Sequence, residues 1–296
     1  MVRLHVKPTL GAVKLAGLDA LKVQALYTAK LDSGLSPRTV QIIHATLHKA
    51  LKQAVRWRLV PRNVCGDVDP PRPPRREVRP LSATQTRALL DAAEGDPLEA
   101  LYVLAVTTGM RQGELLGLQW GDIDLDARVV SVRRTVWAGK ASAPKTAASR
   151  RRVGLSRRAV RALAGHGECA TVESEWVFPS RTGKTPIGVH NFLNRSWYPL
   201  RERAGLHKTV RFHNLRHTCA TLLLGRGVHP KLVQALLGHA SIEMTVDTYS
   251  HVMPEMDGAA ARAMDAALED RPGGPNLVPL EGPETPPDED DEVVEG

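Results

Sequence analysis

The proline-rich stretch DPPRPPRREVRP, residues 69–80, limits what this chain can fold into more than any other feature. It holds five prolines and shows no apolar periodicity, so neither a regular helix nor a central strand can run through it. A chain of 296 residues is long enough to build two hydrophobic cores. We therefore expect two domains, residues 1–68 and 81–270, joined by an extended linker at 69–80.

One long helix is predicted in the first domain, from Ser36 to Arg56. Ser36 can cap its first turn, and Pro37 fits its first helical position. Its apolar residues recur at helical spacing, at Val40, Ile43, Leu47, Ala50, Leu51 and Ala54. Four basic residues lie largely off this stripe: Arg38, Lys49, Lys52 and Arg56. These cations either contact phosphates or form an ordinary solvated face.

The second domain is predicted to be mainly α-helical with a small antiparallel β-sheet. Ser82 caps its first helix, and an apolar helix at 98–108 breaks at Gly109 before another helix begins. Residues 122–156 alternate apolar and polar side chains between turn residues, which indicates short antiparallel strands. The pattern then becomes helical again. The last segment, 271–296, is proline-rich and acidic, and we expect it to be disordered.

Charge is unevenly distributed along the chain. The whole chain has a net charge of +8, but residues 271–296 contribute −7, so residues 1–270 carry +15. A body this basic suggests a polyanionic partner, most simply nucleic acid. An ordinary basic surface in an arginine-rich proteome would explain the same net charge. Charge alone does not decide between these two interpretations.

Cysteine usage and hydropathy indicate a cytoplasmic protein. The three cysteines, Cys65, Cys169 and Cys219, are odd in number and widely spaced, which fits neither a disulfide framework nor a Cys-rich zinc site. The N-terminus has no apolar signal core, and the apolar run at 100–106 is too short to span a bilayer.

The stretch VRFHNLRHTCATLLL, residues 210–224, predicts a helix with cations in its first turn. Its buried stripe is expected at Leu215, Cys219, Leu222 and Leu223, and its opposite side at His213, Arg216 and His217. The amino end of a helix favours anions, and arginine matches phosphate oxygens, so a phosphate site is one interpretation. Ordinary surface cations are another. Zinc is a third, because His213 and His217 are spaced as in H-E-x-x-H, but Asn214 stands where that motif needs its glutamate.

The four tyrosines differ in their surroundings. Tyr27, Tyr102 and Tyr198 have apolar packing neighbours, whereas Tyr249 has polar ones. Any tyrosine with a chemical role is therefore expected at position 249.

Four short motifs follow one another along the second domain. They are R-x-x-E-L-x-x-L at 111–118, H-x-L-R-H-T at 213–218, L-L-G-H at 236–239 and T-x-x-x-Y at 245–249. Each motif alone is weak, but the series resembles the signature of the tyrosine recombinase (phage integrase) family in order and spacing. The resemblance covers residues 1–258. Residues 34–51 also resemble the core-DNA-binding domain of actinobacterial integrases, so the fold it implies is a helical core-DNA-binding domain followed by an α+β catalytic domain.

The resemblance implies roles for the residues of these motifs. Tyr249 would attack the scissile phosphate and form a 3′-phosphotyrosyl link, while Arg111 and Arg216 clamp the non-bridging oxygens. His213 would act as a base or as a donor to the phosphate, and His239 would hydrogen-bond the same phosphate.

Further roles come from the same resemblance. Lys145, in the stretch APKTAASRRRVGL, would be the general acid for the departing 5′-oxygen; a solvated loop lysine is the alternative. Glu114 and His217 would support the site. Position 214 is Asn where the family often has an acid, so local pKa tuning is expected to differ. No metal and no other cofactor is implied, because the cations take their place.

The implied partner is double-stranded DNA carrying attachment or core sites, bound by a nucleoid-associated protein that does not touch membranes. A free monomer would assemble into a homotetramer in the synaptic complex, with an accessory DNA-bending protein from host or phage. The linker arginines Arg72, Arg75 and Arg76 would lie along the phosphate backbone, as would the basic residues of 36–56. Residues 251–269 would form a helix that docks on a neighbouring protomer, or one that folds back on its own domain.

Residues 2–11 resemble a segment that family members reach only after a first core-binding helix and often an arm-binding domain. A wrongly assigned start, a degraded prophage remnant and a natural short form are the open explanations. The function expected is site-specific recombination that integrates or excises a phage or mobile element. The alternative is a truncated remnant that only binds DNA.

Overall fold

The computed structural model describes residues 1–74, 79–137, 139–142, 150–170 and 172–238, together with 264, 265 and 268. The chain divides into two compact units, Met1–Glu77 and Val78–Gly296. Each unit has its own hydrophobic core. The prediction that residues 271–296 are disordered lies outside the described residues.

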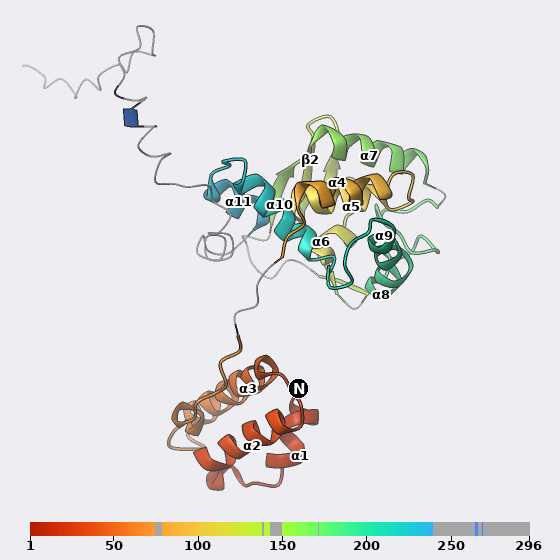
Figure 1. Ribbon diagram of the computed structural model, residues 1–296. Helices are drawn as coiled ribbons and strands as arrows, with labels where there is room; N and C mark the ends of the chain where they lie inside the picture. The colour runs from red at the N-terminus through yellow and green to blue at the C-terminus, as the bar shows by residue number, and fades with distance from the viewer. Residues whose placement is uncertain are drawn as a thin grey trace, which may run out of the picture. The chain divides into compact units, whose positions relative to one another are not determined.

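The first unit is helical throughout its described regular structure (Figure 1). Its elements are η1 (Val2–Val6), α1 (Lys7–Leu10), η2 (Leu15–Gly17), α2 (Ala20–Asp32), α3 (Pro37–Arg56) and η3 (Val64–Asp67). Ser36 caps α3 as predicted, its Oγ accepting from the backbone N–H of Thr39 at 3.2 Å. Asp19 caps α2 in the same way, through the N–H of Lys22 at 2.8 Å.

The core of the first unit lies between α2 and α3. The apolar stripe of α3 is buried at Val40, Ile43, Leu51 and Ala54, and it packs near Val23, Leu26 and Tyr27 of α2. Ala50 is exposed, so its predicted burial is wrong. It lies at the edge of the stripe, where the neighbouring helix no longer covers it.

The second unit is built around α5, an apolar helix buried along almost its whole length. The helices of this unit are α4 (Ala83–Ala92), α5 (Glu99–Thr108), α6 (Gln112–Leu116), η4 (Trp120–Asp122), α7 (Arg157–Glu168), α8 (Val189–Phe192), η6 (Leu193–Trp197), α9 (Tyr198–Arg203), α10 (Asn214–Leu224) and α11 (Pro230–Leu237). Helix α5 packs against α4, α6, α7 and α10 (Figure 1). Ser82 caps α4 with a capping box that includes Gln85. This central packing brings residues from distant parts of the sequence to the carboxyl end of α5.

Two small antiparallel sheets lie beside these helices. The strands are β1 (Ile123–Asp124), β2 (Val129–Val132), β3 (Thr135–Trp137), β4 (Lys140–Ser142) and β5 (Arg151–Gly154). One sheet has the order β1-β2-β5, with Val130 opposite Val153, and the other is the hairpin β3-β4. The predicted fold class, mainly α with a small antiparallel sheet, is confirmed.

Helix α10 is more buried than its sequence predicted. Leu215 and Cys219 are buried as expected, but Leu222 and Leu223 are only half-buried, and Arg216 is 4% exposed. The reason is that α10 lies between α5 and α11, so protein covers most of its circumference. The sequence predicted Arg216 on the side of α10 opposite the buried stripe, and this is wrong for its burial, because its guanidinium points into the protein.

None of the helices in the described part of the chain is long and apolar enough to cross a membrane.

Candidate active site

A left-handed glycine joins α5 to α6 and opens the site. Gly109 ends α5 with a φ of +60°. A Cβ added there would lie 2.5 Å from Cδ2 of Leu237, so only glycine fits both the backbone conformation and the space. Arg111 follows as the N-cap residue of α6, and its side chain is 39% exposed. The break predicted at Gly109 thus places Arg111 at the surface of the site.

Arg216 reaches the same place from α10. Its Nη1 donates to the carbonyl oxygen of Gly109 at 2.7 Å, and its Nη2 donates to that of Leu237 at 2.7 Å. Both bonds are formed by a side chain that is nearly removed from solvent. The guanidinium is therefore fixed between the end of α5 and the end of α11.

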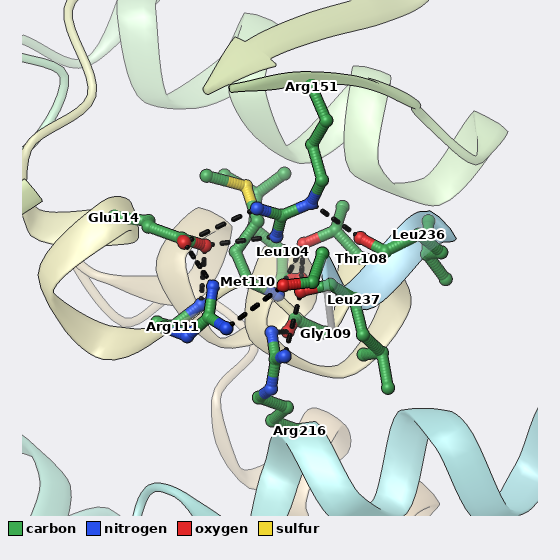
Figure 2. A network of polar contacts seen from close by, with 11 residues as sticks. Leu104, Thr108, Gly109, Met110, Arg111, Glu114, Arg151, Arg216, Leu236 and Leu237 are labelled. Atoms are coloured by element: carbon green, nitrogen blue, oxygen red, sulfur yellow. Dashed lines mark hydrogen bonds and ion pairs between the residues drawn. The ribbon is translucent and has the colours of Figure 1, made fainter. Parts of the chain in front are cut away.

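The carboxyl end of α11 collects three arginines on three consecutive carbonyls (Figure 2). Arg151 Nε donates to Leu236 O at 2.6 Å, Arg216 Nη2 to Leu237 O at 2.7 Å and Arg111 Nη2 to Gly238 O at 3.2 Å. The last carbonyls of a helix lack partners within the helix and carry the negative end of its dipole. Cations from α6, β5 and α10 satisfy them here, which ties four segments into one site.

Glu114 binds two of these arginines at once. Its carboxylate accepts from Arg111 through the backbone N–H at 2.9 Å and through Nη1 at 2.8 Å. It also accepts from Nη1 and Nη2 of Arg151 at 3.3 and 3.0 Å. Burial raises the pKa of Glu114, but the hydrogen bonds and charge of Arg151, together with the bonds from Arg111, outweigh burial and hold that pKa below its usual value. The ionised carboxylate fits the supporting role expected of Glu114.

His213 and His217 lie at the amino end of α10, with ring centroids 5.0 Å apart in an edge-to-face arrangement. Burial lowers the pKa of His213, and the charges of Arg216 and Arg111 lower it further. Burial, His213 and Arg216 lower the pKa of His217 to about 4. Both rings are therefore neutral at pH 7 in the protein without DNA. Among the described residues, no third His, Cys, Asp or Glu joins them in a group that could hold a metal ion.

Asn214 has a structural use for its amide. Its Nδ2 donates to the carbonyl of Arg79 at 2.9 Å, and its Oδ1 accepts from the N–H of Arg211 at 3.1 Å. A carboxylate could accept the second bond but not donate the first, because it carries no N–H. Asn214 thus holds the start of α10 to the segment that leads into the second unit.

The structure brings together Arg111, Glu114 and Arg216, with His213 close enough to feel the charge of both arginines. Lys145, His239 and Tyr249 lie outside the described residues. In the sequence, however, Gly238 directly precedes His239, and β5 begins six residues after Lys145.

Arg151 is a site residue that the sequence analysis missed. Its signal was the alternation along β5: Val153 faces the core, so Arg151, two residues earlier, faces the same way, while Arg152 is exposed. Its side chain is 7% exposed. An arginine on the inward face of a strand needs buried acceptors, which here are Glu114 and Leu236.

In the described part of the first unit, every predicted DNA-contacting residue is exposed, namely Arg38, Lys49, Lys52, Arg56 and Arg72. Arg75 and Arg76 lie outside the described residues. The exposure of the α3 cations confirms that they lie off the apolar stripe.

The tyrosines agree with the sequence analysis at two of the three described positions. Tyr27 and Tyr102 are 1% and 0% exposed. Tyr198 is 40% exposed, with the guanidinium of Arg201 5.0 Å from its ring centroid, so the expectation that it packs among apolar residues is wrong. Adjacent apolar residues did not fix the side of the helix on which it stands.

Comparison with known proteins shows which family this chain resembles in sequence. Residues 79–256 match the phage integrase family, a span that includes all six positions expected to act on the phosphate. The tyrosine recombinase XerC-like protein of Caldanaerobacter subterraneus subsp. tengcongensis is 30% identical, over 86% of this chain and 72% of that protein. An integrase of Streptomyces ambofaciens is 32% identical, over 90% of this chain and 74% of its own.

Solved structures share the fold. The Tn1549 transposon integrase, in complex with transposon right end DNA, superposes with a TM-score of 0.76 at 22% identity, over 90% of both chains. A lambda integrase tetramer bound to a Holliday junction gives a TM-score of 0.58 at 24% identity, over 81% of this chain and 67% of that one. The chain therefore belongs to the phage integrase family and is a tyrosine-type site-specific DNA recombinase.

Proposed function

We propose that this recombinase cuts and rejoins double-stranded DNA at paired core sites through a covalent 3′-phosphotyrosine on Tyr249. The observation that carries the proposal is the placement of Arg111 and Arg216, from two different helices, at the carboxyl end of α11. The next residues of the chain are those expected to bring His239 and Tyr249 to the same phosphate.

Each cleavage step exchanges one phosphodiester for another. The hydroxyl oxygen of Tyr249 forms a bond to the scissile phosphorus, and the bond from phosphorus to the 5′-oxygen breaks. The tyrosine proton passes to His213, and Lys145 gives a proton to the departing 5′-oxygen. Arg111 and Arg216 stabilise the charge that builds on the non-bridging oxygens. Rejoining is the reverse step with a 5′-hydroxyl of another strand, so no nucleotide cofactor is consumed.

The protonation of His213 supports its part in this scheme. Burial and the charges of Arg216 and Arg111 lower its pKa, so the ring is neutral at pH 7 and can accept a proton. A phosphate held between the arginines would bring negative charge beside the ring and favour the imidazolium once the proton has moved.

The first unit is proposed to grip the core site. Helix α3 presents Arg38, Lys49, Lys52 and Arg56 to solvent, opposite its buried stripe. Such a row can neutralise several phosphates without reading the base sequence. Arg72 extends it along the linker, and Arg75 and Arg76 are proposed to do the same. The Tn1549 integrase, in complex with transposon right end DNA, supports a DNA partner.

Assembly into a homotetramer is proposed for the synaptic complex, with a monomer when free. The lambda integrase tetramer on a Holliday junction supports the tetramer on DNA. Met264 and Leu268, beyond Tyr249, are 60% and 75% exposed and are available to a neighbouring protomer. Integration or excision of a mobile element, on chromosomal DNA in the cytoplasm and with a DNA-bending accessory protein, is the biological reaction proposed.

Covalent trapping tests the proposal. Duplexes made from DNA flanking the gene, nicked near the candidate core site, let the freed 5′-end diffuse away after cleavage. Wild type and Tyr249→Phe are run side by side on denaturing gels. A DNA–protein band with wild type alone is expected. No band with wild type, while native gels still show binding, would overturn the catalytic proposal and leave a protein that only binds DNA.

A further inference from the structure

Arg151 holds three guanidinium nitrogens in bonds to protein, on two different segments. Its Nη1 and Nη2 donate to Glu114, and its Nε donates to the carbonyl of Leu236 (Figure 2). Its side chain is 7% exposed, against 39% for Arg111. Arg151 therefore lies behind Arg111 and is poorly placed to reach a phosphate that approaches from solvent.

Arg111 and Arg151 share the carboxylate of Glu114, and this sharing limits how many bonds Arg111 makes to it. Arg111 gives Glu114 only its backbone N–H and Nη1, while its Nη2 donates to Gly238 O. The two bonds from Arg151 use the other acceptor positions of the Glu114 carboxylate. Without Arg151, Arg111 would be the remaining cation bonded to the Glu114 carboxylate, which is 3% exposed. A buried carboxylate favours two parallel hydrogen bonds from one guanidinium. Arg111 would turn toward Glu114 and away from the phosphate.

The second anchor acts on α11. The bond from Arg151 goes to the carbonyl of Leu236, two residues before Gly238, the C-cap of α11. It fixes the same helix end whose carbonyls hold Arg216 and Arg111. Arg151 of β5 thus bonds both to Glu114, which accepts from Arg111, and to the end of α11, whose carbonyls accept from Arg111 and Arg216.

We infer that Arg151 is a positioning residue for strand cleavage, which shares Glu114 with Arg111 and so keeps Arg111 directed at the scissile phosphate. The inference rests on the proposed function, in which Arg111 contacts that phosphate. In this assignment Arg151 acts through Glu114 and Arg111, not on the reacting atoms directly.

The test is single-turnover covalent cleavage at saturating DNA by the full chain. Arg151→Lys keeps the positive charge but loses the fork, and Arg151→Gln loses both. A displaced catalytic group can cost on the order of 100-fold, so we expect about 10-fold slower cleavage for Arg151→Lys and about 100-fold for Arg151→Gln. DNA affinity should stay near wild type. Arg203→Gln is the matched control, since Arg203 also joins a carboxylate, that of Asp96, to a helix-end carbonyl, that of Ala92. It should cleave at the wild-type rate.

A second substrate separates positioning from a purely structural ion pair. A methylphosphonate at the scissile position has a methyl in place of one non-bridging oxygen, so it carries less charge for Arg111 to stabilise. On the methylphosphonate substrate, the difference in cleavage rate between wild type and Arg151→Lys should narrow from about 10-fold to about 2- or 3-fold. Adding Glu114→Gln to Arg151→Gln should recover part of the lost rate, because no carboxylate then draws Arg111 away.

Each outcome decides the matter. The same fold loss on both substrates, in parallel with lowered thermal stability, would overturn the positioning role, as would wild-type rates for Arg151→Gln. If wild type itself forms no covalent complex on the native phosphate, the proposed function fails and the Arg151 role with it. Wild-type cleavage with unaffected Arg151 variants would refute the Arg151 role alone.

Discussion

Helix α3 of the first unit and the carboxyl end of α11 in the second unit both gather cationic side chains, in opposite environments. Arg38, Lys49, Lys52 and Arg56 on α3 are exposed. Around α11, Arg216 and Arg151 are almost removed from solvent and bonded to backbone carbonyls and Glu114. An exposed cation is screened by salt and loses side-chain entropy when it binds, whereas a buried, bonded guanidinium is already oriented.

This difference matches the tasks proposed for the two regions. Loose cations can follow a phosphate backbone of any sequence, and their contribution falls as salt rises. Cations held in fixed positions stabilise a charge that exists only in the transition state, with little reorganisation when it appears. Charge removal should therefore lower affinity in the first region and the cleavage rate in the second.

The largest effect is expected from Arg216→Gln. The change removes a proposed phosphate clamp together with both carbonyl bonds, to Gly109 and Leu237. Loss of one such donor typically slows a reaction by about 10²- to 10³-fold, and single-turnover cleavage at saturating DNA measures it. DNA binding should change little. If Arg216→Gln binds DNA weakly but cleaves at the wild-type rate at saturating DNA, the proposed difference between the two regions is wrong.

A backbone substitution should have the next largest effect. Gly109→Ala combines a left-handed residue with a Cβ that lies 2.5 Å from Leu237 Cδ2. Overpacking of this kind costs about 1–3 kcal/mol, in addition to the left-handed strain of about 1–2 kcal/mol. Urea denaturation of the full chain measures the loss, and cleavage should fall too, because Gly109 O holds Arg216.

Gly34→Ala is the control in the first unit. Gly34 has a φ of +85°, but nothing lies within 4 Å of an added Cβ. It should show the strain of about 1–2 kcal/mol without the overpacking, and normal cleavage. Equal losses of stability at the two glycines would mean that the packing of Leu237 against Gly109 adds nothing.

The two regions also differ in how far their sequences predicted them. Helix α3 is amphipathic and covered on one side, so residue types at its start predicted its cap, and helical spacing predicted most of its stripe and its exposed cations. Helix α10 is covered by α5 and α11 together, so the same reasoning misplaced Arg216. Arg151 escaped notice because its partners, Glu114 and Leu236, lie 37 and 85 residues away in sequence. Periodicity predicts one buried face; it does not predict which distant carbonyls an inward cation will meet.

A smaller effect is expected from single charges on α3. If Lys52 neutralises one phosphate, Lys52→Gln should lower the slope of log affinity against log salt by about 0.9. Affinity falls most at low salt, and the cleavage rate at saturating DNA stays at the wild-type value. Salt titrations of wild type and variant, on core-site and unrelated duplexes, provide the measurement. A loss confined to the core site would assign Lys52 to sequence recognition instead of the phosphate backbone.

The last prediction concerns pH and uses His217, beside Arg216 and His213. Its pKa is about 4 in the folded protein and about 6.5 when unfolded. Between these values the unfolded chain binds more protons, so stability is full above pH 6.5 and falls as the pH drops toward 4. The melting temperature of wild type should therefore fall more between pH 7 and pH 5 than that of His217→Gln. Lys52→Gln, on α3 of the first unit, is the control, and its melting temperature should fall with pH as much as that of wild type. Equal falls for wild type and His217→Gln would mean that the ring is not held neutral by its burial and by the charge of Arg216.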